Sequence, residues 1–94
     1  MSDHVVILPK TFNDKRMAKK LLPDSLEGKA TVVVHCEGTV FASQDACSEL
    51  VRRLTVDEDH PVVITGARST VIFFFKEAAS LLGTSTKMFY QKAL

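Results

Sequence analysis

The sequence is short of the residues and patterns that mark several large protein classes. Its 94 residues contain no tryptophan, one tyrosine, two cysteines, three prolines and four glycines. The longest apolar runs, such as residues 71–75, are far too short to cross a bilayer. Asp3 precedes the first apolar run and no basic region does, which argues against a signal peptide. We therefore expect one cytoplasmic domain over residues 1–94, with no membrane contact and with reduced thiols.

Charge and motif content exclude further classes. The net charge of +1 gives no global attraction to nucleic acid or anionic lipid. The sequence has no CxxC or HxxxH spacing for a metal, no GxGxxG and no Walker loop. The basic residues between positions 10 and 20 are typical of a solvated helix face. We expect no metal, no cofactor and no nucleic-acid partner.

Apolar runs and turn residues alternate along the chain. Strands are predicted at residues 4–8, 30–36, 61–65 and 87–90. Helices are predicted from Thr11 or Asn13 to residue 22, after an N-cap at Ser43, and over residues 70–82 between Ser69 as N-cap and Gly83 as C-cap. The second helix has an apolar stripe at helical spacing, followed by a charged turn at residues 56–60. That stripe consists of Ala46, Cys47, Leu50, Val51 and Leu54.

This order of elements predicts the fold class. Strands alternate with helices as β-α-β-α-β-α-β, and the central strands are apolar on both faces. Both features favour a small α/β domain with a mostly parallel four-stranded sheet and helices packed on it.

The stretch VVVHCEGTVFAS, residues 32–43, resembles the nucleophile loop of a cysteine-dependent phosphatase. Such chemistry needs an Arg six positions after the Cys to hold the phosphoryl oxygens, but position 42 is Ala. Glu37 would repel an anionic substrate and raise the thiol pKa. We expect Cys36 to end a buried strand, Cys47 to lie in the core, and His35 to meet backbone or water. A cysteine enzyme at Cys36 is the least favoured function, and no catalytic residue is assigned.

A second chemical alternative lies in the stretch GARST. Gly66, Arg68, Ser69 and Thr70 place a glycine, a cation and two hydroxyls at a predicted helix N-terminus. This arrangement is compatible with a nucleotide or an anion, although most such segments are only turns followed by a helix.

The third helix contains the clearest anomaly. At about 100° per residue, one side of it is apolar and is predicted to face the core. That side comprises Val71, Phe74, Phe75, Ala78, Leu81 and Leu82. Phe73 falls in the middle of the opposite, polar side, where a core-packing role is absent. A large apolar group among polar ones is typical of a surface that binds a partner or a second copy of the chain.

Four stretches together resemble STAS domains, the sulfate-transporter and anti-sigma-factor-antagonist family. VVVHCEGTVFAS resembles the family's strand and turn, and QDACSELVRRL resembles the helix that follows. VVITGARSTVIFFFKEAASLLG is similar to the next strand and helix, and KMFYQKAL to the last strand with its Ala-Leu ending. Upstream, TFNDKRMAKKLL is similar to the early helix of small stand-alone STAS-like domains. The resemblance covers residues 30–94 best.

The resemblance implies a non-enzymatic switch or docking module whose partner is a kinase acting as an anti-sigma factor. In the antagonists, a serine at the start of the second helix is phosphorylated, which blocks docking. Alignment on Phe41 and Leu50 places Asp45 at that serine, Gln44 at the first serine and Ser43 at an aspartate. Asp45 cannot accept phosphate, so the resemblance implies a lost switch, or Ser43 as the alternative acceptor, or an unrelated partner.

The function predicted from the sequence is therefore a regulatory protein–protein interaction module. Its partner is a kinase, an anti-sigma-like regulator or a host protein, the last if the chain comes from a phage or mobile element. A homodimer is also compatible with the sequence. The predicted partner-binding residues are Ser43, Gln44, Asp45, Arg68, Phe73 and Lys76.

Overall fold

The computed structural model describes residues 2–91, and a four-stranded sheet runs through them. Its strands are β1 (Ser2–Ile7), β3 (Lys29–His35), β5 (Val62–Thr65) and β6 (Met88–Gln91). They lie side by side in the order β1-β3-β5-β6, and every neighbouring pair is parallel. The predicted α/β class with a mostly parallel four-stranded sheet is confirmed.

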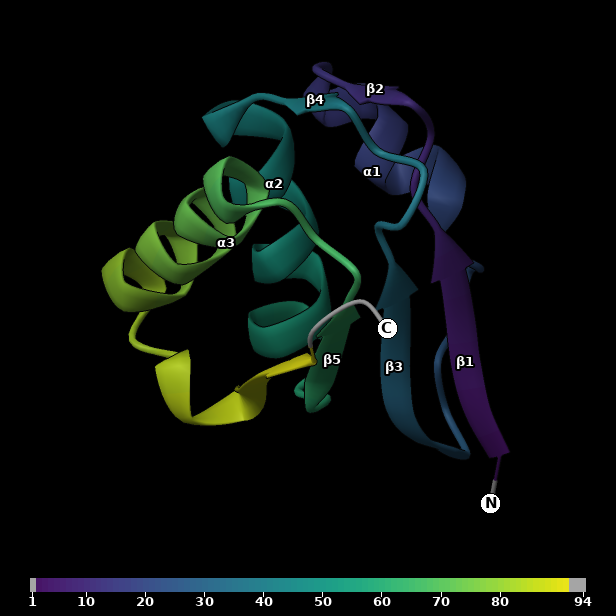
Figure 1. Ribbon diagram of the computed structural model, residues 1–94. Helices are drawn as coiled ribbons and strands as arrows, with labels where there is room; N and C mark the ends of the chain where they lie inside the picture. The colour runs from purple at the N-terminus through teal and green to yellow at the C-terminus, as the bar shows by residue number, and fades with distance from the viewer. Residues whose placement is uncertain (1, 92–94) are drawn as a thin grey trace.

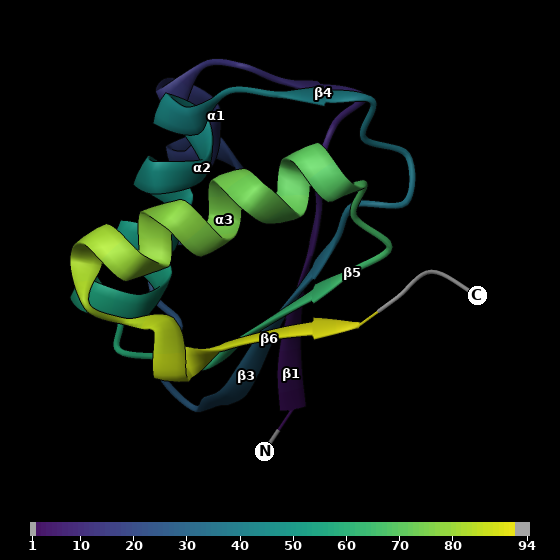
Figure 2. The same ribbon diagram turned by 60° about the vertical axis from the view of Figure 1, so that its left-hand side comes forward.

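Three helices connect these strands and form a single layer. They are α1 (Lys15–Leu21), α2 (Gln44–Val51) and α3 (Ser69–Leu82). Each connection joins strands that are neighbours in the sheet, and parallel crossovers are right-handed, so successive helices fall on the same face. Figures 1 and 2 show all three helices on one side of the sheet, with α2 between α1 and α3.

The hydrophobic core lies between this helix layer and the sheet. Alternate residues of the strands point into it and are buried: Val6, Leu8, Val32, Val34, Cys36, Val62, Ile64 and Met88. The apolar stripe predicted on the second helix is buried throughout and packs on these side chains of the sheet. Because burial of one such side chain contributes about 1.5–3 kcal/mol, this interface accounts for most of the stability of the fold.

The helix ends follow local capping chemistry, with two differences from the prediction. Ser43 caps α2, since its hydroxyl accepts a hydrogen bond of 3.2 Å from the backbone N–H of Ala46. Gly83 ends α3 in the left-handed conformation at φ 72°, as predicted. The prediction of Thr11 or Asn13 as the first cap is wrong, because Asp14 caps α1. Ser69 is also not a cap: it is the first residue of α3.

The start of the first helix shifts because the residues before it form another structure. β2 (Thr11–Phe12) pairs in parallel with β4 (Phe41–Ala42), making a two-stranded sheet that the sequence did not predict. This small sheet lies beside the helix layer, and its Phe12 side chain is fully buried. The chain can therefore enter α1 only after residue 12.

Two helical segments differ from the predicted pattern. A π-helical segment (Arg52–Asp57) continues α2, so the predicted charged turn at residues 56–60 begins two residues later than expected. In α3, Val71, Phe75 and Ala78 are buried as predicted, and Phe74 and Leu82 are half-buried. Leu81 was predicted to face the core, but it is 76% exposed. The buried arc extends to Ala79 instead, which leaves Leu81 outside its border.

Phe12 on β2 and Phe41 on β4, one phenylalanine from each strand of the small sheet, give a matched pair for testing this packing. Phe12→Ala should lower the free energy of unfolding by about 3–5 kcal/mol, because the truncation leaves a cavity in the core. Phe41→Ala should change it by less than about 1 kcal/mol, because Phe41 is 54% exposed. Urea unfolding followed by circular dichroism measures both. Equal effects of the two substitutions would contradict the placement of β2 against the core.

Candidate functional site

The start of α2 and the middle of α3 meet at one polar contact on the helix layer. The Gln44 side-chain N–H donates to the Glu77 carboxylate at 2.6 Å, across 33 residues of sequence. Ser43 is held just before it, because its backbone N–H donates to the Phe12 carbonyl at 2.9 Å. Asp45 follows in the first turn of α2 and is exposed. Two of the predicted partner-binding residues, Ser43 and Gln44, thus lie beside α3.

Phe73 lies on the same side of α3 as this contact. It precedes Glu77 by four residues, so the two side chains are neighbours along the helix surface. Phe73 is 58% exposed and stands opposite the buried arc of α3, as the helical pattern predicted. Phe41, on β4 alongside α3, is also exposed. We call the region formed by Phe41, Gln44, Phe73 and Glu77 the Phe73 surface.

The two predicted cationic residues lie at the borders of this region. The Lys76 ammonium lies over the ring of Tyr90, 5.2 Å from the ring centre, and is therefore turned toward β6. Arg68 precedes α3 and is exposed.

A carboxylate side chain packs against residues 66–70, the loop that the sequence indicates as a possible anion site. Gly66 adopts a left-handed conformation at φ 65°, and Arg68, Ser69 and Thr70 after it are exposed. The side chain of Glu37 packs so closely on Gly66 that an added Cβ would lie 2.5 Å from its Cγ. The pKa of Glu37 is lowered, mainly because its carboxylate accepts a hydrogen bond from the backbone N–H of the same residue. The Glu37 side chain is therefore charged at neutral pH. A fixed negative charge at this place is unfavourable for an anionic ligand.

Glu37 belongs to a small cluster at the carboxyl ends of β3 and β5. The Thr65 hydroxyl donates to Glu37 at 3.0 Å, and His35 Nδ1 lies 2.8 Å from the same hydroxyl. His35, which was predicted to meet backbone or water, therefore meets two side chains. Within residues 2–91, no group of three or more His, Cys, Asp or Glu side chains has the arrangement of a metal site.

The two cysteines are buried in the core. Burial raises the pKa of Cys36 to about 12, and the neighbouring Glu37 charge adds to this effect. Burial also raises the pKa of Cys47 to about 12. Both thiols keep their protons at neutral pH, which is unfavourable for a nucleophile or a metal ligand.

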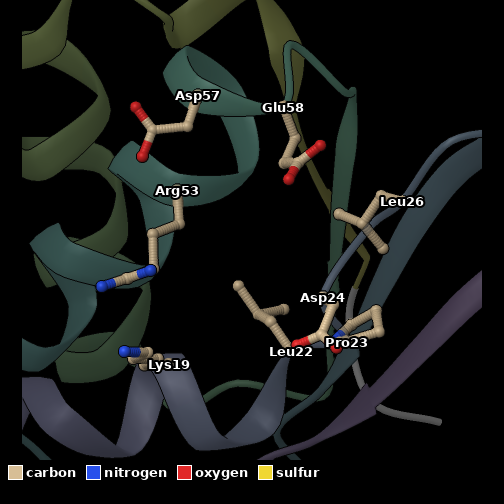
Figure 3. Close-up of a pocket in the computed structure, with 8 residues that line it drawn as sticks. All are labelled: Lys19, Leu22, Pro23, Asp24, Leu26, Arg53, Asp57 and Glu58. Atoms are coloured by element: carbon tan, nitrogen blue, oxygen red, sulfur yellow. The ribbon is translucent and has the colours of Figure 1, made fainter.

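A hollow of about 220 Å³ lies between the end of α1 and the π-helical segment (Figure 3). Lys19 and Arg53 lie near one another on one part of its wall, and the carboxylates of Asp57 and Glu58 lie on another. Arg53 is also bound to Glu49 at 2.7 Å. The mixture of both charge signs gives the hollow no preference for an anion or a cation.

No protein-family model, no curated protein and no solved structure matches this chain. Among the helices described within residues 2–91, none has the length and apolar character needed to span a membrane. The site must therefore be interpreted from its own geometry.

Two members of the Phe73 surface, Gln44 and Phe73, are among the residues that the sequence predicts to bind a partner, and the other two are not. The helical period alone puts Glu77 on the polar side of α3, but it does not indicate the contact with Gln44. Phe41 gave no signal, because its exposure depends on the unpredicted pairing of β2 with β4. Both omissions concern contacts between segments about 30 residues apart.

Proposed function

We propose that this chain is a non-enzymatic, regulatory protein-interaction module of STAS-like type, whose partner binds at the Phe73 surface. The observation that carries the proposal is the 58% exposure of Phe73 on a helix whose other large aromatic residues are buried or half-buried. An aromatic side chain held on a rigid helix provides a large contact area at low entropic cost.

The polar contact beside Phe73 supports this proposal. The Gln44–Glu77 hydrogen bond fixes the start of α2 against α3, so Phe73 and Phe41 are presented on connected elements. Arg68 and Asp45 at the rim offer one charge of each sign, and such rim charges contribute to orientation and association rate more than to affinity. A protein partner with an apolar pocket for the Phe73 ring fits this chemistry.

The alternatives from the sequence receive less support. The Glu37 carboxylate beside Gly66 opposes nucleotide or anion binding at the loop. The buried, protonated Cys36 thiol opposes nucleophilic catalysis. The partner class remains that of the sequence proposal: a kinase or anti-sigma-like regulator, or a host protein if the chain is encoded by a phage or mobile element.

Truncation of Phe73 tests the proposed surface. Phe73→Ala should weaken partner capture by about tenfold or more, as loss of a binding hot spot does. The melting temperature should change little, because the ring is mostly exposed. Phe89→Ala is the matched control, since Phe89 is a similarly exposed phenylalanine and lies on β6, away from the helix layer.

The measurement is quantitative affinity capture from extract of the source cell, with thermal unfolding of each variant in parallel. Equal capture by wild type and Phe73→Ala would contradict the proposal. A loss of about 3 kcal/mol of stability in Phe73→Ala would instead show that the ring belongs to the core.

We further propose that the module lacks the phosphoserine switch implied by the STAS resemblance. Asp45 stands at the position of the acceptor and already places a negative charge at the start of α2. The Ser43 hydroxyl is used as the helix cap. Intact-mass measurement of protein isolated from its source cell should find no added phosphate, and Ser43→Ala should leave that mass spectrum otherwise unchanged. A phosphate that disappears in Ser43→Ala would overturn this part of the proposal.

A further inference from the structure

The face of the sheet turned away from the helices is uncovered and contains several exposed apolar side chains. Val5, Ile7 and Phe89 point to this side and are 50%, 71% and 52% exposed. Val33 and Val63, on the two central strands, are only half-buried although they lie in the middle of the sheet. We call the face formed by Val5, Ile7, Val33, Val63 and Phe89 the open face. In Figures 1 and 2, none of the helices drawn within residues 2–91 lies on this side.

The strand register joins these side chains into one continuous row. Val5 pairs with Val33, Val33 with Val63, and Val63 with Phe89. The row therefore crosses all four strands without a charged or polar side chain. The next row toward the carboxyl ends contains Ile7, His35, Thr65 and Gln91, and is polar in its central part.

Such a face is unusual for a parallel sheet. Parallel sheets occur almost only with both faces covered, because their strands are apolar on both sides. Antiparallel sheets, in contrast, often face water, and they do so with polar side chains. The apolar row has the composition of a covered face; it consists of Val5, Val33, Val63 and Phe89. We therefore expect another polypeptide to lie on it.

The dimensions of the open face indicate what can cover it. The axes of the outer strands are about 14 Å apart, at about 4.8 Å per strand. A single helix, about 10 Å in diameter, would leave part of this width uncovered. A second four-stranded sheet matches it completely.

We propose that the open face packs against the same face of a second copy of this chain. The result is a homodimer of four layers, in the order helices, sheet, sheet, helices, with the two sheets about 10 Å apart. The contact is self-complementary, because an uncharged row meets an uncharged row and no like charges are brought together there. A two-fold axis along the strands places the large Phe89 of one copy over the smaller Val5 of the other, and Val33 over Val63.

The size of the contact sets its strength. Four strands of this length give a footprint on the order of 300–400 Å² per copy, whereas stable complexes bury about 800 Å² per partner. The dimer should therefore be weak and dependent on concentration. It also leaves the Phe73 surface on the outer layers, so this inference does not depend on the proposed function.

Matched lysine substitutions on the two sides of the molecule test the dimer. Ile7→Lys and Phe89→Lys place a charge in the open face, whereas Phe73→Lys places one at a similarly exposed phenylalanine on the helix layer. Sedimentation velocity at protein concentrations from about 10 µM to 1 mM should show wild type and Phe73→Lys shifting from monomer to dimer. Ile7→Lys and Phe89→Lys should remain monomeric over the same range.

Circular dichroism and melting temperature at about 10 µM show whether each variant is folded. Using two independent open-face variants guards against the case in which one of them unfolds. A wild type that stays monomeric at 1 mM overturns the proposal and leaves the open face to a partner of another kind. A dimer that Phe73→Lys disrupts, or that both open-face variants retain, overturns it as well.

Discussion

Each pair of neighbouring strands in the four-stranded sheet is parallel and is joined by a single crossover, and this topology determines where the core and the exposed surfaces lie. Because each crossover is right-handed and leads to the neighbouring strand, all three helices lie on one face of the sheet. The core is therefore confined to a single layer between helices and sheet. The Phe73 surface lies on the outside of the helices, and the open face lies on the opposite side of the molecule. The two candidate binding surfaces are thus consequences of one topological choice.

Local patterns predicted much of this fold, and contacts between distant segments account for what they missed. The cap at Ser43, the left-handed Gly83 and the stripe of α2 each depend on neighbouring residues and were predictable. The burial of Phe12 was not, because it requires a pairing with Phe41–Ala42 about 30 residues later. The valine runs at residues 32–34 and 62–63 predicted strands correctly. They could not show which face is covered, because valine occupies both faces.

The candidate site likewise has one feature that the sequence predicts and one that only the structure shows. The exposure of Phe73 follows from the period of one helix, so the sequence alone indicated it. The hydrogen bond between Gln44 and Glu77, which places Phe73 beside the start of α2, joins two helices and required the structure. The structure also reduces the support for the two alternative functions. The Glu37 carboxylate lies on Gly66, which is unfavourable for anion binding, and Cys36 is buried, which is unfavourable for catalysis. What remains exposed and apolar is suited to contact with protein, on both sides of the molecule.

Solvent paramagnetic relaxation of valine methyl groups shows whether one face of this parallel sheet is uncovered in the monomer. At about 10 µM, where the chain should be monomeric, a soluble gadolinium chelate relaxes methyl groups according to their distance from solvent. If the face is uncovered, three open-face valines should relax strongly and three core-facing valines on the sheet should be protected. The former are Val5, Val33 and Val63, and the latter are Val32, Val34 and Val62. Equal protection of both sets in the monomer would contradict it.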